Sequence, residues 1–397
     1  MDSKNSFINK LYQPLYLVGL FLLVALAVIS AVRPAQNIFE GITNVIFAAL
    51  LPALFFFGRS AKKSYKIQDV LYLIGIVVGV IVFVSMITTW INYGFFHALL
   101  YKNTPIYYLN GTPYDVTKEV IFFSGLQFQE VSVNYAGAFG LIAAAYLPGS
   151  FFIERKQNKT KFLITLSVGV VGLLSLLTVP NFKAVIVLAI VSGFALIYKF
   201  YWQNKKVIKA IKYVLLALFA LALIFYLVSG INVLVGRKFT GFFDKLFASN
   251  PIMNKATQVM EVDGVYKNLF GLSFVKVVTS DIKLIVQLET GIFEVELLKE
   301  VGSIGVIISL LFILVSFISF DKYLETSDDD DFSKVTIVMF FATTFIYNSL
   351  FYSSGARIMT GEYNFVLRFV PFLIAIFLLG MTYFSQNKTK EGQKHEA

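Results

Sequence analysis

The chain alternates between long apolar segments and short polar connections, and within the apolar segments hydrophobic residues follow one another without interruption. A run of about 20 apolar residues is what an α-helix needs to cross a bilayer core of about 30 Å. A transmembrane β-barrel would instead show segments of about ten residues in which apolar and polar positions alternate. The pattern therefore predicts an all-α polytopic membrane protein, because a helix satisfies its own backbone hydrogen bonds in lipid.

About ten segments have the required length and character. We predict spanning helices over residues 14–32, 38–58, 70–90, 134–153, 162–179, 183–202, 213–235, 302–320, 335–351 and 365–384. Two connections, 91–132 and 236–301, are much longer than the others. We interpret 1–397 as a single integral membrane domain that carries these two long loops and a polar tail, 385–397.

The apolar stretch 120–128 inside the first long loop is too short to span a membrane. We predict that it is a re-entrant or interfacial segment.

Basic residues gather on every second connection, which sets the orientation of the chain. Arg59, Lys62, Lys63 and Lys66 follow the second segment, and similar clusters follow the fourth and sixth. Short loops rich in Lys and Arg remain in the cytoplasm. We therefore predict that both termini are cytoplasmic and that both long loops lie outside. The acidic run 328–331 falls in a cytoplasmic connection, and we interpret it as a solvated run without metal-ligand spacing.

Composition supports the membrane prediction and excludes several kinds of site. With 57% apolar and 15% charged residues, a soluble domain of 397 residues would aggregate. The net charge of +10 is explained by the basic loops, so we predict no nucleic-acid binding. The chain has no cysteine, which excludes disulfides and thiolate sites, and only two histidines, His97 and His395. We predict that it uses no cofactor and no metal.

Several cations lie on the predicted outer side, against the positive-inside trend. They are Lys183, Arg237, Lys238, Arg357 and Arg368. Each alone is consistent with an interfacial anchor whose side chain reaches lipid phosphate. Together they favour an outward-facing pocket for a pyrophosphate, because Arg binds phosphate through a planar fork and Lys adds a point charge. Fixed cations of this kind stabilise a departing pyrophosphate without a metal.

Acidic residues at the end of the second long loop are candidate bases for activating a sugar hydroxyl. They are Glu289, Glu294, Glu296 and Glu300. The alternative for each is a solvated loop acid. No Asp or Glu falls in the middle of a predicted span, which argues against an ion-coupled transporter.

Three segments resemble the O-antigen polymerase and ligase superfamily of bacterial membrane glycosyltransferases. The link Thr178-Val179-Pro180-Asn181-Phe182-Lys183-Ala184 is similar to a short outer link of that family, with Lys183 in place of its arginine. Leu269-Phe270-Gly271-Leu272-Ser273 is similar to a segment of the family's large outer loop. Glu300-Val301-Gly302-Ser303-Ile304-Gly305 is similar to the acidic and glycine-containing end of that loop.

The resemblance implies a glycosyltransferase that acts on undecaprenyl-pyrophosphate-linked oligosaccharide at the outer face of the bacterial plasma membrane. Lys183 and Arg237 match best the positions that hold the pyrophosphate in the family. The ligases carry a histidine in the large loop, and this loop has none. That difference favours a polymerase of capsule, exopolysaccharide or O-antigen repeats, with a flippase and a chain-length regulator as possible partners.

Two other functions stay open on the sequence. One is a transporter or flippase of lipid-linked oligosaccharide, although flippases usually have more spans and no large outer loop. The other is a membrane acyltransferase, for which His97 would be the base. In its aromatic surroundings, His97 is more typical of an interfacial residue.

Overall fold

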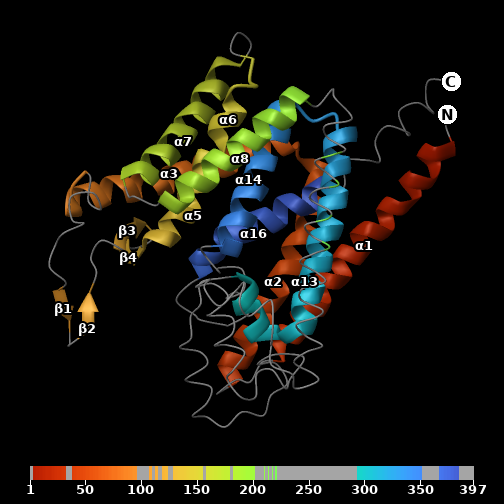
Figure 1. The fold of residues 1–397 in the computed structure, drawn as a ribbon, viewed down its shortest axis with the longest axis horizontal. Coiled ribbons are helices and arrows are strands. Elements are labelled where there is room, and N and C mark those ends of the chain that lie inside the picture. The colour runs from red at the N-terminus through yellow and green to blue at the C-terminus, as the bar shows by residue number, and fades with distance from the viewer. Residues whose placement is uncertain are drawn as a thin grey trace, which may run out of the picture.

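The structure is a computed structural model. It describes residues 3–32, 38–95, 107–109, 112–114, 119–123, 128–154, 158–178, 182–201, 293–350 and 366–383, together with four isolated helical positions at 210, 213, 217 and 220. The described part is mostly helical, as predicted (Figure 1). Most of the predicted helix 213–235 lies outside the described residues.

The described helices lie close to the predicted segments. They are α1 (Ser3–Ala31), α2 (Ile38–Ser64), α3 (Ile67–Tyr93), α5 (Val133–Ala144), α6 (Tyr146–Ser150), α7 (Lys159–Thr178), α8 (Phe182–Tyr201), α13 (Phe293–Thr326), α14 (Asp331–Leu350) and α16 (Val366–Thr382). Two antiparallel hairpins lie in the first long loop and pair β1 (Tyr107–Leu109) with β2 (Thr112–Tyr114), and β3 (Glu119–Phe123) with β4 (Phe128–Ser132).

Three helical segments within the described residues are long and apolar enough to cross a membrane. They are Ile67–Tyr93, Lys159–Thr178 and Ile304–Glu325. Shorter apolar stretches cover Leu15–Ala31, Ala184–Gly193 and Leu373–Thr382. These segments are consistent with membrane association, while the full set of ten spans remains a prediction.

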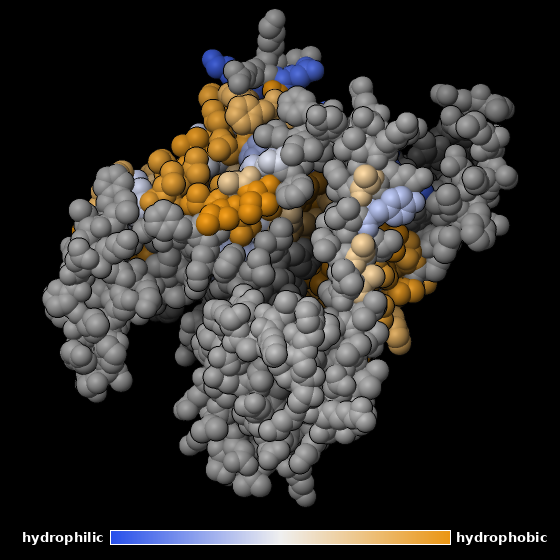
Figure 2. Space-filling model, in the orientation of Figure 1, coloured by the Kyte–Doolittle hydropathy of each residue, from blue (hydrophilic) through white to orange (hydrophobic). Residues whose placement is uncertain are grey.

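Large apolar side chains cover much of the outside of these helices. Leu73, Val80 and Ile186 are each more than half exposed. Figure 2 shows apolar surface over the region that α7 and α8 occupy in Figure 1. A soluble monomer rarely exposes so much apolar surface, whereas a helix in lipid does so at no cost.

Short connections predicted to lie on the same side of the membrane, one basic and one acidic, meet at one end of the bundle. The turn between α2 and α3 lies beside the turn between α13 and α14, since Lys62 contacts Asp329 and Gln68 contacts Asp330. The α6 segment also reaches the start of α14, where Gly149 lies against Thr336. Helix α7 starts at this end, after α6, and α13 ends here, at its turn to α14. The end of α7, where α8 begins, and the start of α13 therefore lie at the opposite end of the bundle. This arrangement agrees with the alternation of basic connections in the sequence.

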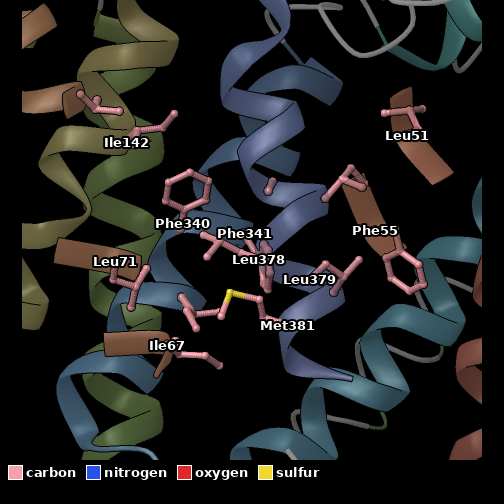
Figure 3. Close-up of a cluster of buried hydrophobic side chains, with 14 of the residues drawn as sticks. Leu51, Phe55, Ile67, Leu71, Ile142, Phe340, Phe341, Leu378, Leu379 and Met381 are labelled. Carbon is pink, nitrogen blue, oxygen red and sulfur yellow. The ribbon is translucent and has the colours of Figure 1, made fainter. Parts of the chain in front are cut away.

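The core joins helices from both halves of the chain. Figure 3 shows Leu71 of α3, Ile142 of α5, Phe340 of α14 and Leu378 of α16 as parts of one buried cluster, which continues to Phe55 of α2. Phe55 has no exposed surface and packs against Tyr16, Phe312 and Tyr383. The helices on either side of the second long loop are therefore packed together.

Glycines allow the closest helix contacts. Gly169 and Gly172 of α7 face Leu147 and the backbone of Ala143–Ala144, where an added Cβ would overlap backbone atoms. Small residues at such contacts let helix backbones approach each other, which is how helices associate without a hydrophobic driving force in lipid.

The segment predicted as re-entrant or interfacial contains strand β3, which pairs with β4, and its position relative to a membrane stays a prediction. Val120 and Phe122 are buried, and the Phe122 ring packs edge-on against Tyr135 of α5, with ring centroids 4.8 Å apart. A run of β-branched and aromatic residues favours a strand once a second strand pairs its backbone. Over so few residues, hydrophobic periodicity does not distinguish a strand from a buried helical segment.

The helix predicted over 134–153 is interrupted at one residue, Ala145, between α5 and α6. Helix α5 ends at Ala144 and α6 begins at Tyr146. Pro148 explains the break, because a proline lacks an N–H and its ring clashes with the carbonyl four residues earlier, at Ala144. The buried Tyr146 hydroxyl secures the junction by donating to the Leu71 carbonyl at 2.7 Å.

Candidate functional site

Lys183 is the second residue of α8, directly after the short link from α7. The backbone on both sides of the link is held in place. Thr178 is buried and donates its hydroxyl to the Leu174 carbonyl at 2.7 Å, and Ala184 is completely buried in a cluster with Leu176 and Tyr347. The position of Lys183 at the start of α8 thus follows from packing on both sides of it.

The other predicted cations divide into two groups. Arg368 is the third residue of α16, within its first turn, as predicted. Arg237, Lys238 and Arg357 lie outside the described residues. The structure therefore places the backbone of Lys183 and of Arg368, and one pocket shared by the five cations stays a prediction.

The candidate acids lie on a helix rather than in an extended loop end. Glu294, Glu296 and Glu300 belong to the first nine residues of α13, before a bend at Gly302. Positions 296 and 300 are four residues apart and share one face of this helix, whereas position 294 lies elsewhere around it. Glu289 lies outside the described residues, as does His97. The start of α13 and the start of α8 are at the same end of the bundle, opposite the basic turns.

The hairpin β3–β4 is anchored to α3 beside this end. The Phe123 amide donates to the Ser85 hydroxyl at 2.9 Å, and the Thr89 hydroxyl donates to the Ile121 carbonyl at 3.1 Å. A small cavity lies between the hairpin and the helices, and its volume is about 10 Å³. Its lining includes Ser85, Met86, Thr89, Phe122 and Ser175. That volume holds one water molecule and no sugar. Sequence analysis missed this anchor, since its partners are more than 30 residues apart.

The acidic run at the other end is not simply solvated, which corrects that interpretation. Lys62 donates to both carboxylate oxygens of Asp329, at 2.9 and 3.1 Å, and both side chains are mostly buried. Ser327 donates to Asp329 at 2.7 Å, and Gln68 donates to Asp330 at 3.1 Å. The signal in the sequence was the placement of a basic and an acidic cluster on the same predicted side of the membrane.

The surroundings of Asp329 lower the pKa of its carboxyl. Burial alone would raise its pKa, but the hydrogen bonds from Ser327 and Lys62, with the charge of Lys62, outweigh burial and lower the pKa. A carboxyl whose pKa is lowered by folding stabilises the folded protein above its unfolded pKa of about 3.9. That contribution is lost as the pH falls below this value.

We expect Asp329→Asn to destabilise the protein at pH 7 by about 2 kcal/mol, because it removes charged hydrogen bonds from a mostly buried site. The measurement is the Tm of the purified protein in detergent from pH 7 to pH 3, where the difference from wild type should shrink below about pH 4. Asp328→Asn is the matched control, since Asp328 is exposed. Equal effects of the two substitutions at pH 7 would contradict the assignment.

No protein-family model, curated protein or solved structure matches this chain.

Proposed function

We propose that this chain is a bacterial membrane glycosyltransferase that polymerises oligosaccharide repeats carried on undecaprenyl pyrophosphate, for capsule, exopolysaccharide or O-antigen synthesis. One observation carries the proposal. Lys183 at the start of α8 and Glu294, Glu296 and Glu300 at the start of α13 lie at the end of the bundle opposite the basic turns. A cation for a leaving pyrophosphate and acids for a sugar hydroxyl are the two chemical groups that this reaction needs.

The orientation of this end toward the outside of the plasma membrane is part of the proposal. Arg59, Lys62, Lys63 and Lys66 lie at or beside the turn from α2 to α3, and Lys322 and Lys334 flank the turn from α13 to α14. Cytoplasmic retention of the basic turn from α2 to α3, beside which the turn from α13 to α14 lies, leaves the starts of α8 and α13 facing outward. There the lipid carrier presents its substrates after they have crossed the membrane.

In the proposed reaction, one acid among Glu294, Glu296 and Glu300 takes the proton from a hydroxyl at the non-reducing end of the acceptor repeat. The hydroxyl oxygen then bonds to the anomeric carbon of the donor glycan. The bond from that carbon to the pyrophosphate breaks, and undecaprenyl pyrophosphate leaves with the electron pair. Lys183 and Arg237, with Lys238, Arg357 and Arg368 as further candidates, neutralise its growing charge.

Reporter fusions test the orientation. We expect fusions placed after residues in 103–117 and in 250–263 to report the outside of the membrane. The segments on either side of the first loop have basic clusters at their other ends, and the segment after the second loop ends beside the basic turn from α2 to α3. Fusions after residues 64 and 327 serve as controls and should report the cytoplasm. A cytoplasmic signal from either long loop would contradict the topology and the outward-facing site.

Reconstitution tests the activity. We expect purified protein incubated with a lipid-linked repeat to produce a ladder of polymers, and we expect the ladder to persist in excess EDTA because protein cations serve in place of a metal. Loss of activity with EDTA and recovery with Mg²⁺ would overturn the metal-independent mechanism and point to the glutamates as ligands. Movement of the lipid-linked repeat across a vesicle membrane without any ladder would favour a flippase.

A further inference from the structure

A buried glycine interrupts the longest helix of the described residues. Gly302 in α13 has φ 66° and ψ −170°, while the residues on both sides are helical. This combination belongs to a region that glycine adopts readily and that residues with a Cβ essentially avoid. Conformations of this kind persist where the surrounding structure holds them in place, and they are concentrated at functional sites.

The bend separates two parts of different character. After it comes the apolar span Ile304–Glu325, which is fixed in the core through Val306 and Phe312. Before it come residues 293–301, which we call the acidic arm and which carry Glu294, Glu296 and Glu300. Figure 1 shows the beginning of α13 turned away from the axis of its long upper part. Because the span is held by its packing, the backbone at Gly302 determines the direction of the arm.

We propose that Gly302 is a positioning residue. It acts as a fixed joint that holds the acidic arm at an angle to the span and so places the arm's acids for the reaction. The placement of the acids for the reaction rests on the proposed function, whereas the fixed angle at Gly302 does not. A residue with a Cβ at position 302 is strained in this conformation, and it relieves the strain by adopting helical angles, which lets the arm turn. Because the residues on both sides of position 302 are helical, a straight helix through this position is the simplest way to relieve the backbone strain.

Distances between spin labels measure the joint directly. The chain contains no cysteine, so Lys299→Cys with Ile318→Cys gives a labelled pair without removing native thiols. Ile318 is 43% exposed, which leaves room for a label. A continuous straight helix would separate these two Cα atoms by about 28 Å. We expect a single, shorter distance in the otherwise wild-type protein in nanodiscs, and a longer or much broader distribution after Gly302→Ala.

A second variant and a control distinguish a change in the angle of the arm from a general loss of folding. An alanine inserted before Gly302 keeps the glycine and rotates the arm by about 100° about the helix axis. Val306→Ala removes buried methyl groups from the anchored span and should lower the Tm without changing the label distance. A straight-helix distance in the wild-type protein, or an unchanged distribution in Gly302→Ala, would overturn the joint.

Kinetics test the role of the joint in the reaction. We expect both Gly302→Ala and the insertion to lower kcat by about 100-fold with little change in KM, because small misplacements of a catalytic group act on the chemical step. Val306→Ala should leave the ratio of kcat to KM near that of wild type. A shifted distance with unchanged kcat would refute the positioning role. If the wild-type protein makes no polymer, the proposed function and the catalytic role fail together, while the label distances still decide the joint.

Discussion

Replacing Lys183 by alanine is expected to abolish polymer formation while leaving the protein in the membrane. The side chain of residue 183 is proposed to neutralise the leaving pyrophosphate, and loss of one such cation removes charge stabilisation in the transition state, which is worth about 10²–10³ in kcat. Lys183 lies at the start of α8, where Thr178 and Ala184 are buried on either side. The measurement is polymer length and yield, in cells and from purified protein, normalised to the amount of protein in the membrane.

Matched variants separate the role of the charge from effects on folding. Lys183→Arg should retain activity, because it keeps the cation and restores the residue type that the family resemblance implies. Lys199→Ala alters a lysine near the other end of the same helix and should leave polymer formation intact. Arg237→Ala should also abolish polymer. Full polymer production by both Lys183→Ala and Arg237→Ala would refute the proposed pyrophosphate site.

Replacing Gly380 of α16 by alanine is expected to destabilise the helix bundle by about 3 kcal/mol, near the upper end of overpacking effects. An added Cβ at Gly380 would overlap the Phe55 carbonyl, and one at Gly58 would overlap the Phe377 carbonyl. Both obstacles are backbone atoms, so a rotamer change cannot relieve them and the two helices must separate. The expected readout is a lower Tm for Gly380→Ala and for Gly58→Ala in detergent.

The chain offers a neutral control for this substitution. An added Cβ at Gly193 of α8 meets no atom within 4 Å. Gly193→Ala should therefore leave the Tm unchanged or raise it slightly, since alanine favours a helix over glycine by about 1 kcal/mol. If Gly193→Ala and Gly380→Ala lower the Tm by similar amounts, the close contact between α2 and α16 is not the cause of the destabilisation.

Sequence alone determined where most of the described helices lie. The predicted segments 70–90 and 183–202 correspond to α3 (Ile67–Tyr93) and α8 (Phe182–Tyr201). The physical reason is that a bilayer imposes a run of about 20 apolar residues and rejects charge within it, so length and charge together mark the helix ends. The same rules predicted which connections lie on one side, and the contact of Lys62 with Asp329 agrees with that prediction.

The candidate site was predicted only as a set of residue types at the ends of helices. Lys183, Arg368 and Glu296 occupy the first turns or first residues of described helices. Whether Arg237, Lys238 and Arg357 join them depends on segments outside the described residues, so the pyrophosphate pocket remains a prediction. Charge and spacing indicate which groups suit the chemistry, but neither gives the direction in which a helix presents them.

Tertiary structure decided the features that depend on residues far apart in the chain or on one backbone conformation. The hairpin β3–β4 packs on α3 and α5. The mostly buried Asp329 keeps its charge because Lys62, which is 267 positions away, contacts it. The bend at Gly302 is likewise absent from the apolar pattern, since no other glycine inside a described helix has a positive φ. Hydropathy reports the transfer of each residue into lipid one at a time, whereas pairing, burial and bending depend on which neighbours the folded chain brings together.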